Sequence, residues 1–183
     1  MTRFGPLADP SRSAPPTPGA YWVLDGWLAA GPHPHADPVD RLGDLLDAGF
    51  DTFVNLTAQH IAGSTDRHLE DYTEAVTRRG GLVVDLPIQD MGVPGVGQAA
   101  AMLNVIDAAL GDARRVYVHC WAGVGRTGTV VGCWLVRHGV DPDDAVATLD
   151  ALRWGLAGDS PQTHEQVLFI EHWERHDRRL GEI

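Results

Sequence analysis

Short runs of apolar and β-branched residues alternate along the chain with longer segments whose apolar residues recur every three to four positions. The short runs predict strands and the spaced pattern predicts helices. The predicted strands are 21–24 and 27–30, joined by the turn Asp25-Gly26, then 52–56, 82–86 and 116–118. The predicted helices are 37–49, 66–79, 99–110, 125–138, 142–153 and 161–179. This alternation predicts an α/β fold with a central, mainly parallel, twisted sheet of about four to five strands and helices on both faces.

The domain limits follow from length and composition. Residues 1–19 contain five prolines and no apolar run, so we expect a flexible arm there and a single domain over 20–183. A chain of 183 residues can bury roughly 70% of its unfolded surface in one core. Two cysteines are too few for a disulfide framework, and no apolar run approaches the ~18 residues of a membrane span. With no secretory leader pattern, the expected location is the cytoplasm.

The charge of the chain limits its partners. All 14 basic side chains are Arg, and 25 acidic residues bring the net charge to -11. Such a field repels nucleic acid and anionic lipid, so we expect no nucleic-acid partner. We also expect no membrane insertion, because no apolar run is long enough, and we expect a monomer. A local site for one anion remains compatible with it, because a few amides and one Arg act at short range.

The segment HCWAGVGRTG, residues 119–128, lies where the predicted strand 116–118 ends and a helix begins. Ligands of α/β sheets bind at this carboxyl end. Two glycines among the five residues between Cys120 and Arg126 let the backbone curl and direct several N–H groups at one oxyanion. Arg126, in the first turn of the helix, can bind two phosphate oxygens at once. The same amides favour the thiolate form of Cys120, which makes it a nucleophile aimed at phosphate.

This segment resembles the C-x5-R signature of the protein tyrosine phosphatase superfamily, in the HCxxGxGR(S/T)G form of its dual-specificity branch. The resemblance implies that Cys120 is the nucleophile and that Arg126 and the loop amides bind the phosphate. It also implies that the Thr127 hydroxyl helps the sulfur to leave and that His119 holds the loop. The expected substrate-binding residues are Trp121, Ala122, Gly123, Val124, Gly125, Arg126 and Gln162. The structural alternative is a buried Cys in an ordinary glycine-rich turn.

Asp90 is the leading candidate for the general acid that the departing oxygen needs. It lies in a loop with Gly92 and Pro94, 30 residues before Cys120, and the resemblance implies a mobile acid at about this offset. Asp85 is the alternative, although its place in the strand pattern also suits a structural role. Microscopic reversibility gives the same carboxyl a second role as base for the attacking water.

The segment 162–169, QTHEQVLF, resembles the glutamine motif QTxxQxxF of tyrosine phosphatases. The resemblance implies that one glutamine positions the water that hydrolyses phosphocysteine. Gln162 and Gln166 are spaced to share one helix face, and Gln166 is the predicted water-orienting residue. The alternative is a capped amphipathic helix with exposed glutamines.

Other histidines and the second cysteine are predicted to be structural. His172 and His176 have the i, i+4 spacing of metal ligands but lie among charged residues, which favours a solvated helix face. His33 and His35 flank a loop proline and indicate no chemistry. Cys133 would lie roughly 10 Å along its helix from the nucleophile, too far for a disulfide, and is predicted to belong to the core.

Taken together, these residues predict a Cys-dependent protein tyrosine or dual-specificity phosphatase that works through phosphocysteine without metal or cofactor. The expected partner is a phosphorylated protein or a small aryl phosphate, because Trp121 and Val124 give an apolar entrance and the chain has no Lys. Phosphoserine and phosphothreonine remain open as substrates. The alternatives are a phosphoinositide, nucleotide or other small-molecule phosphatase, and an inactive phosphate-binding module.

Overall fold

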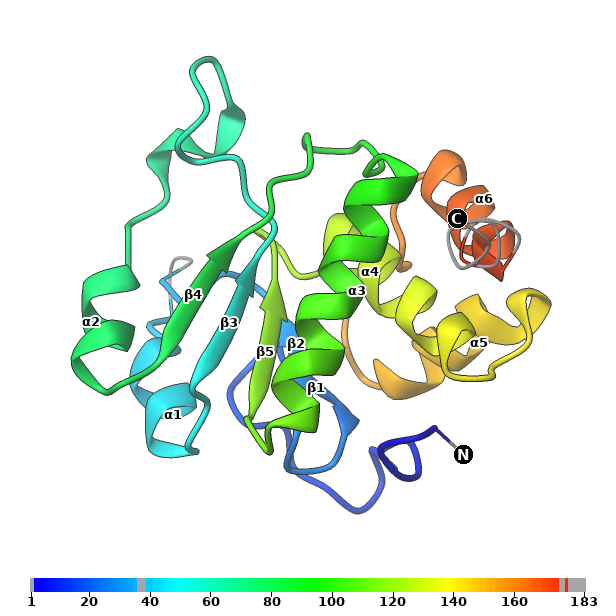
Figure 1. Ribbon diagram of the computed structural model, residues 1–183, viewed down its shortest axis with the longest axis horizontal. Coiled ribbons are helices and arrows are strands. Elements are labelled where there is room, and N and C mark those ends of the chain that lie inside the picture. Colours follow the sequence, from blue (N-terminus) through cyan, green and yellow to red (C-terminus); the bar gives the residue numbers. More distant parts are fainter. Residues whose placement is uncertain (1, 36–38, 175–176, 178–183) are drawn as a thin grey trace.

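The sheet is the centre of the computed structural model, which describes residues 2–35, 39–174 and 177. In these residues five strands lie in the order β1-β2-β5-β3-β4 (Figure 1). The strands are β1 (Tyr21–Leu24), β2 (Leu28–Gly31), β3 (Thr52–Asn55), β4 (Leu82–Asp85) and β5 (Val116–His119). β1 pairs with β2 antiparallel, and the other three pairings are parallel. The predicted α/β architecture is confirmed.

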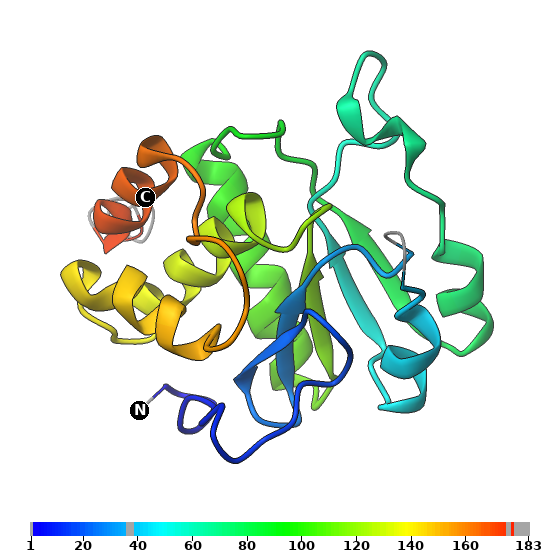
Figure 2. The same cartoon turned by 180° about the vertical axis from the view of Figure 1, so that it is seen from behind.

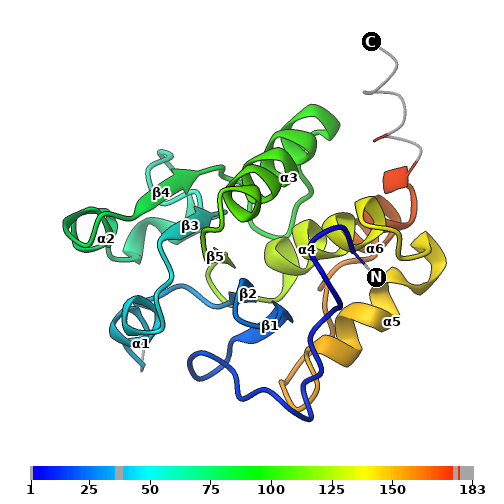
Figure 3. The same ribbon diagram turned by 60° about the horizontal axis from the view of Figure 1, so that its bottom comes forward.

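Helices cover both faces of the sheet. They are α1 (Leu42–Asp47), the short 3-10 helix η1 (Thr65–His68), α2 (Thr73–Arg78), α3 (Val96–Gly111), α4 (Gly125–Arg137), α5 (Pro142–Leu152) and α6 (His164–Glu171). α3, α4, α5 and α6 lie on one side of the sheet, and α1 and α2 lie on the other (Figures 1 and 2). Figure 3 shows the two groups of helices separated by the sheet. No helix in the described residues is long and apolar enough to cross a membrane.

Two hydrophobic cores, one on each face, hold β5 in the middle of the fold. Val116 and Val118 pack with α3 and α4 residues such as Trp134, whereas Tyr117 packs with Phe53 on the α1 and α2 side. All four β5 residues are buried. Because Cys120 directly follows this strand, the nucleophile candidate is set at the edge of the most buried part of the protein.

The predicted polar helix 66–79 is wrong, because two short helices occupy this range. η1 ends at His68, Leu69 is extended with φ -74° and ψ 138°, and α2 begins only at Thr73. The environment of Asp66 also differs from that of a residue in a polar surface helix. Its side chain is buried and accepts hydrogen bonds from the Ala58 amide and from Arg126. A residue held in this way cannot lie on the solvated face of a regular helix.

Several helix ends also differ from the prediction. α1 begins at Leu42, after an N-cap residue Arg41, and the predicted cap Asp37-Pro38 lies outside the described residues. α3 begins three residues earlier than predicted, at Val96, where the Gln98 side chain returns to the Gly95 amide. α6 begins at His164 rather than at residue 161, and the predicted end of this helix at residue 179 is also outside the described part.

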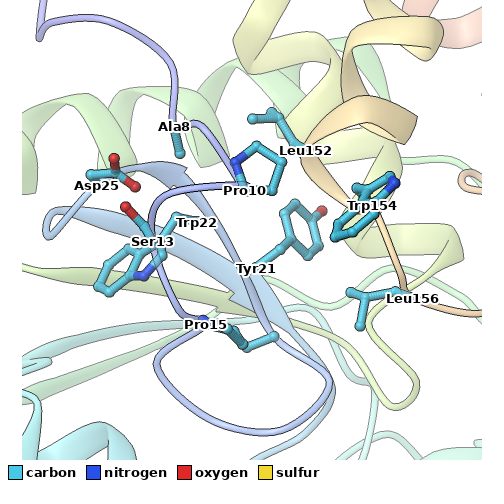
Figure 4. Close-up of a pocket in the computed structure, with 11 residues that line it drawn as sticks. Ala8, Pro10, Ser13, Pro15, Tyr21, Trp22, Asp25, Leu152, Trp154 and Leu156 are labelled. Atoms are coloured by element: carbon cyan, nitrogen blue, oxygen red, sulfur yellow. The ribbon is translucent and has the colours of Figure 1, made fainter.

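The proline-rich segment before residue 20 lies against the domain. The Ala8 amide donates to the Val23 carbonyl of edge strand β1, and the Trp22 indole donates to the Ala14 carbonyl. Between this segment and the end of α5 is a cavity of about 70 Å³, on which Pro10, Tyr21 and Trp154 converge (Figure 4). These contacts cover the β1 edge of the sheet. The domain boundary at residue 20 and the flexibility of the arm stay predictions.

Candidate active site

The Cys loop, residues 120–125, connects β5 to α4 at the carboxyl end of the parallel strands. Cys120 is 2% exposed. Gly123 has φ +72°, a conformation that L side chains rarely adopt, and an added Cβ would lie 2.2 Å from the Gly31 carbonyl carbon. The His33 amide donates to the Trp121 carbonyl, which ties the loop to the end of β2. Backbone packed this closely gives the loop one shape.

Arg126 lies in the first turn of α4, beside the loop, and three acceptors hold its guanidinium. Its Nη1 and Nη2 donate to the two carboxylate oxygens of Asp66 at 2.6 and 3.1 Å, and Nη1 also reaches the Ile88 carbonyl at 3.3 Å. Asp90 Oδ1 lies 3.1 Å from Nη2. Burial would lower the pKa of Arg126, but its hydrogen bonds to Asp66 and the neighbouring negative charges raise the pKa above its ordinary value. The guanidinium beside the Cys loop is therefore fixed in orientation and charged.

Asp66 is a site residue that the sequence analysis missed. Burial alone would raise its pKa, but the Arg126 hydrogen bond, the Ala58 amide and the Arg126 charge together lower it. The carboxylate is thus ionised and paired with Arg126 at 1% exposure. A single Asp in a polar run carries no pattern that could reveal a partner 60 residues away. The one available hint was that a buried Arg at this position needs an acidic partner.

The structure separates the two candidates for the general acid. Asp90 lies in the acid loop, residues 86–95, with a 34% exposed side chain that contacts Arg126. Asp85 lies at the end of β4, where its side chain accepts a hydrogen bond from the Asn55 amide at 2.8 Å. Only Asp90 is both partly exposed and adjacent to the guanidinium. The geometry therefore supports Asp90 as the acid.

His119, the last residue of β5, is buried among aromatic rings. Its Nε2 is hydrogen-bonded to the Tyr72 hydroxyl, and its Nδ1 lies 3.2 Å from the Cys120 carbonyl oxygen. Burial lowers the pKa of His119 well below its ordinary value, so the ring is neutral. The edge of His33 packs on this ring at 5.1 Å between centroids. His33, which the sequence left without a role, is thus part of the support of the Cys loop.

Thr127 follows Arg126 in the first turn of α4. Its hydroxyl is buried and has no hydrogen-bond partner among the described residues. The neighbouring hydroxyl of Thr129 is satisfied by the Gly125 carbonyl at 2.9 Å. A buried hydroxyl without a partner is costly. Thr127 is therefore available to donate to a group that enters the loop.

The two glutamines meet the Cys loop differently from the prediction. Gln162 precedes α6 instead of sharing a helix face with Gln166, and its Oε1 lies 2.5 Å from the place that a Cβ on Gly125 would take. Gln166 is fully buried and its amide is occupied: Oε1 accepts from the Gln162 and Thr163 amides, and Nε2 donates to the Gly92 carbonyl of the acid loop. The T-x-x-Q spacing of a capping box could have revealed this.

Trp121 points outward, as an apolar entrance requires. It is 45% exposed, and its ring meets the edge of the His68 ring at 5.4 Å. Ala122 and Val124 complete the loop, and the Val124 carbonyl accepts from the Ser160 hydroxyl. Beside the loop, a cleft of about 450 Å³ opens between residues 58–65 and the acid loop, with Asp90 in its wall.

The remaining candidates lie away from these groups. Cys133 is buried in α4, where burial raises the pKa of its thiol well above the ordinary value, and it forms no disulfide. His172 caps the end of α6, and His176 lies outside the described residues. The structure therefore brings together Cys120, Arg126, Thr127, His119, Asp90 and both glutamines, as the sequence predicted, and adds Asp66, Tyr72 and His33.

The fold and the Cys loop define a class, the phosphoric monoester hydrolases of the protein tyrosine phosphatase type. Residues 31–140 match the family model described as "Polymorphic toxin system, DSP-PTPase phosphatase", and the chain belongs to this family. The match extends from the end of β2 through α4, so it includes the acid loop and the Cys loop.

The sequence relatives are also named as tyrosine phosphatases. The chain is 29% identical over 167 residues to mouse protein tyrosine phosphatase domain-containing protein 1, covering 85% of this chain and 22% of that protein. It is 28% identical over 155 residues to the tyrosine-protein phosphatase CDC14 of Candida albicans, covering 84% of this chain and 28% of that protein. The chain thus spans about a quarter of the length of these relatives. Among solved structures, Tk-PTP in its active form has a TM-score of 0.70 at 27% identity, covering 86% of this chain and 97% of that one.

Proposed function

We propose that this protein hydrolyses phosphotyrosine and related aryl phosphates in two steps through a phosphocysteine at Cys120. The observation that carries the proposal is the placement of Arg126, which lies in the first turn of the helix after the Cys loop and contacts Asp90 at 3.1 Å. An oxyanion binder and a proton donor thereby face the same point beside the nucleophile. An inactive phosphate-binding module would not need this acid.

In the first step the Cys120 sulfur attacks phosphorus and the bond to the tyrosine oxygen breaks. That oxygen takes the proton of Asp90, because a phenoxide is a poor leaving group near neutral pH. Arg126 and the loop amides stabilise the charge on the three non-bridging oxygens of the phosphoryl group. Thr127 donates its free hydroxyl to the sulfur, which lowers the cost of its departure in the second step.

In the second step water attacks the phosphocysteine, Asp90 takes a proton from that water, and the Cys120 thiolate leaves as inorganic phosphate forms. We assign the orientation of this water to Gln162, whose side-chain oxygen lies next to Gly125. Gln166 acts instead on the acid loop, because its amide is already bonded to the Gly92 carbonyl. This moves the water-orienting role from Gln166, for which the motif predicted it, to Gln162.

The fold alone does not determine the substrate, because proteins of similar fold bind different phosphate esters. TpbA of P. aeruginosa was solved with pTyr at 16% identity to this chain, and PTPMT1 was solved with PI(5)P at 20% identity. The choice of an aryl phosphate rests on the exposed Trp121 ring and on the residues that line the adjoining cleft, among which there is no cation. A second phosphate would find no partner there.

The test is hydrolysis of p-nitrophenyl phosphate and a phosphotyrosine peptide by the purified protein. Cys120→Ser is expected to abolish turnover. Cys133→Ala is the matched control, because that buried thiol lies outside the site and its removal should leave turnover intact. Asp90→Asn is expected to slow the peptide reaction by roughly 10²–10⁴-fold. Normal turnover by Cys120→Ser would disprove the assignment, and faster hydrolysis of PI(5)P or phosphoserine peptide than of phosphotyrosine peptide would disprove the substrate class.

A further inference from the structure

The cleft beside Asp90 has not been given a role. It has a volume of about 450 Å³, within the roughly 300–1,000 Å³ of ligand sites. One wall is the loop that rises above the sheet between β3 and η1, and the other is the acid loop (Figures 1 and 2). Because Asp90 lines it, the cleft continues directly from the place where the leaving group is protonated.

The lining is uncharged apart from Asp90, and it combines apolar side chains with neutral polar ones. Ala58, Ile61 and Ala62 supply apolar surface, and Ser64, Thr65 and Gln89 supply hydroxyls and one amide. A lining without a cation offers nothing to a second phosphate. Hydroxyl and amide groups beside apolar surface suit a peptide, which brings backbone N–H and C=O groups together with side chains.

Exposed apolar side chains are also found in the loops around the site. Seven large hydrophobic residues are exposed in the described part of the chain, and three of them belong to the loops around the site: Ile61, Met91 and Trp121. They are 51%, 50% and 45% exposed. Apolar surface exposed to water is unfavourable, so a ligand that covers these side chains gains binding free energy.

The cleft wall is also fixed in place by the catalytic arginine. The Ala58 amide donates to Asp66 Oδ2, the oxygen that also accepts from Arg126, and the Asp66 amide donates to the Ser64 hydroxyl oxygen. The turns Ala58–Ile61 and Ile61–Ser64 are closed by backbone hydrogen bonds. The loop is therefore shaped before a ligand arrives, which reduces the entropy lost on binding.

We infer that this cleft is a subsite for an apolar side chain adjacent to the phosphotyrosine of a peptide or protein substrate. The inference rests on the proposed function for the position of the phosphotyrosine. Ile61 is its specificity-determining residue, and an acidic neighbour of the phosphotyrosine finds no cation in the lining to pair with.

The first experiment compares phosphotyrosine peptides that carry Leu or Glu at each of the two positions on either side of the phosphotyrosine. For at least one position, we expect the wild type to prefer Leu by about tenfold in kcat/KM, the contribution of one partly buried aliphatic side chain. Ile61→Asp should lower the ratio of kcat/KM on the Leu peptide to that on p-nitrophenyl phosphate by about the same factor. Leu82→Asp is the control, because Leu82 is similarly exposed at 48% but begins β4, at the end of the strand away from the acid loop. This variant should leave the ratio unchanged.

The second experiment measures binding by calorimetry to Cys120→Ser, so that no turnover is needed. Preferential binding of the Leu peptide that is lost in Cys120→Ser/Ile61→Asp supports the subsite even if the wild type fails to hydrolyse p-nitrophenyl phosphate, a result that would refute the proposed function alone. Equal affinity for Leu and Glu peptides at every position overturns the subsite. So does tighter binding of short-chain PI(5)P than of any peptide, because the cleft would then receive a lipid phosphate.

Discussion

Replacing Asp66 by Asn tests the ion pair on which the site depends. The substitution keeps the shape of the side chain but removes the charge from a carboxylate that is 1% exposed and bonded to a guanidinium that is 2% exposed. One of the three hydrogen bonds from Arg126 Nη1, Arg126 Nη2 and the Ala58 amide then meets an N–H₂ group and becomes a repulsive contact. The buried arginine loses its nearest countercharge.

The size of the effect follows from burial. Removing one partner of a buried ion pair costs about 3–5 kcal/mol, because the remaining charge is left without compensation. Asp90 remains 3.1 Å from Nη2 and compensates in part, so we expect the lower end, about 3 kcal/mol. In a chain of this length that corresponds to a fall in Tm of roughly 6–12 °C.

The assay is reversible urea unfolding at pH 7, with Asp47→Asn as the control. Asp47 pairs with Arg79 at 3.2 Å, but their side chains are 73% and 59% exposed, so its loss should cost less than about 1 kcal/mol. Because the folded-state pKa of Asp66 is lowered, its contribution is present above the unfolded pKa of about 3.9 and is lost as the pH falls through the folded value. The gap between wild type and Asp66→Asn should therefore narrow below about pH 4. A cost no larger than that of Asp47→Asn would refute this account of the site.

Three further predictions concern the supports of the Cys loop. Gly123→Ala places a Cβ 2.2 Å from the Gly31 carbonyl carbon at φ +72°, so thermal unfolding and kinetics should show both lower stability and almost no turnover; normal activity would contradict the loop geometry. Gln162→Ala should slow phosphocysteine hydrolysis and leave a pre-steady-state burst, whereas Gln166→Ala should weaken acid catalysis by releasing the acid loop; identical kinetics for both would exclude these roles. Burial and the charge of a neighbouring histidine lower the pKa of His33 to about 4, so on acidification the unfolded chain takes up this proton before the folded one. The free energy of unfolding should therefore fall by up to about 3 kcal/mol from pH 6.5 to 4. His33→Asn should flatten this pH dependence, and an unchanged slope would refute the role given to His33.

The fold could be predicted from local patterns because the signals for each strand and helix lie within that element or directly beside it. The strands were located within about one residue, since each is a short β-branched or apolar run between turn residues. The same holds for α5, where Asp141 caps the helix and Pro142 occupies its first turn. The Cys loop was predictable because the spacing of Cys120, the glycines and Arg126 lies within one segment.

Long-range pairing limited what the sequence could show. Asp66 and Arg126 are 60 positions apart, and their pairing buries a residue that the pattern placed on the solvated face of a helix 66–79. The glutamine roles were assigned from a helix that was expected to begin at residue 161. The capping of α6 by Thr163 moves Gln162 out of the helix, toward Gly125, and turns Gln166 inward.

The contact between Asp90 and Arg126 also bears on what happens after the chemistry. When inorganic phosphate leaves, Asp90 can return to the guanidinium, so product and enzyme carboxylate compete for the same donor. A phosphatase built in this way carries its own competitor for phosphate. Product inhibition should therefore be weak, and the enzyme should keep turning over in compartments where millimolar phosphate would occupy a site whose arginine stood alone.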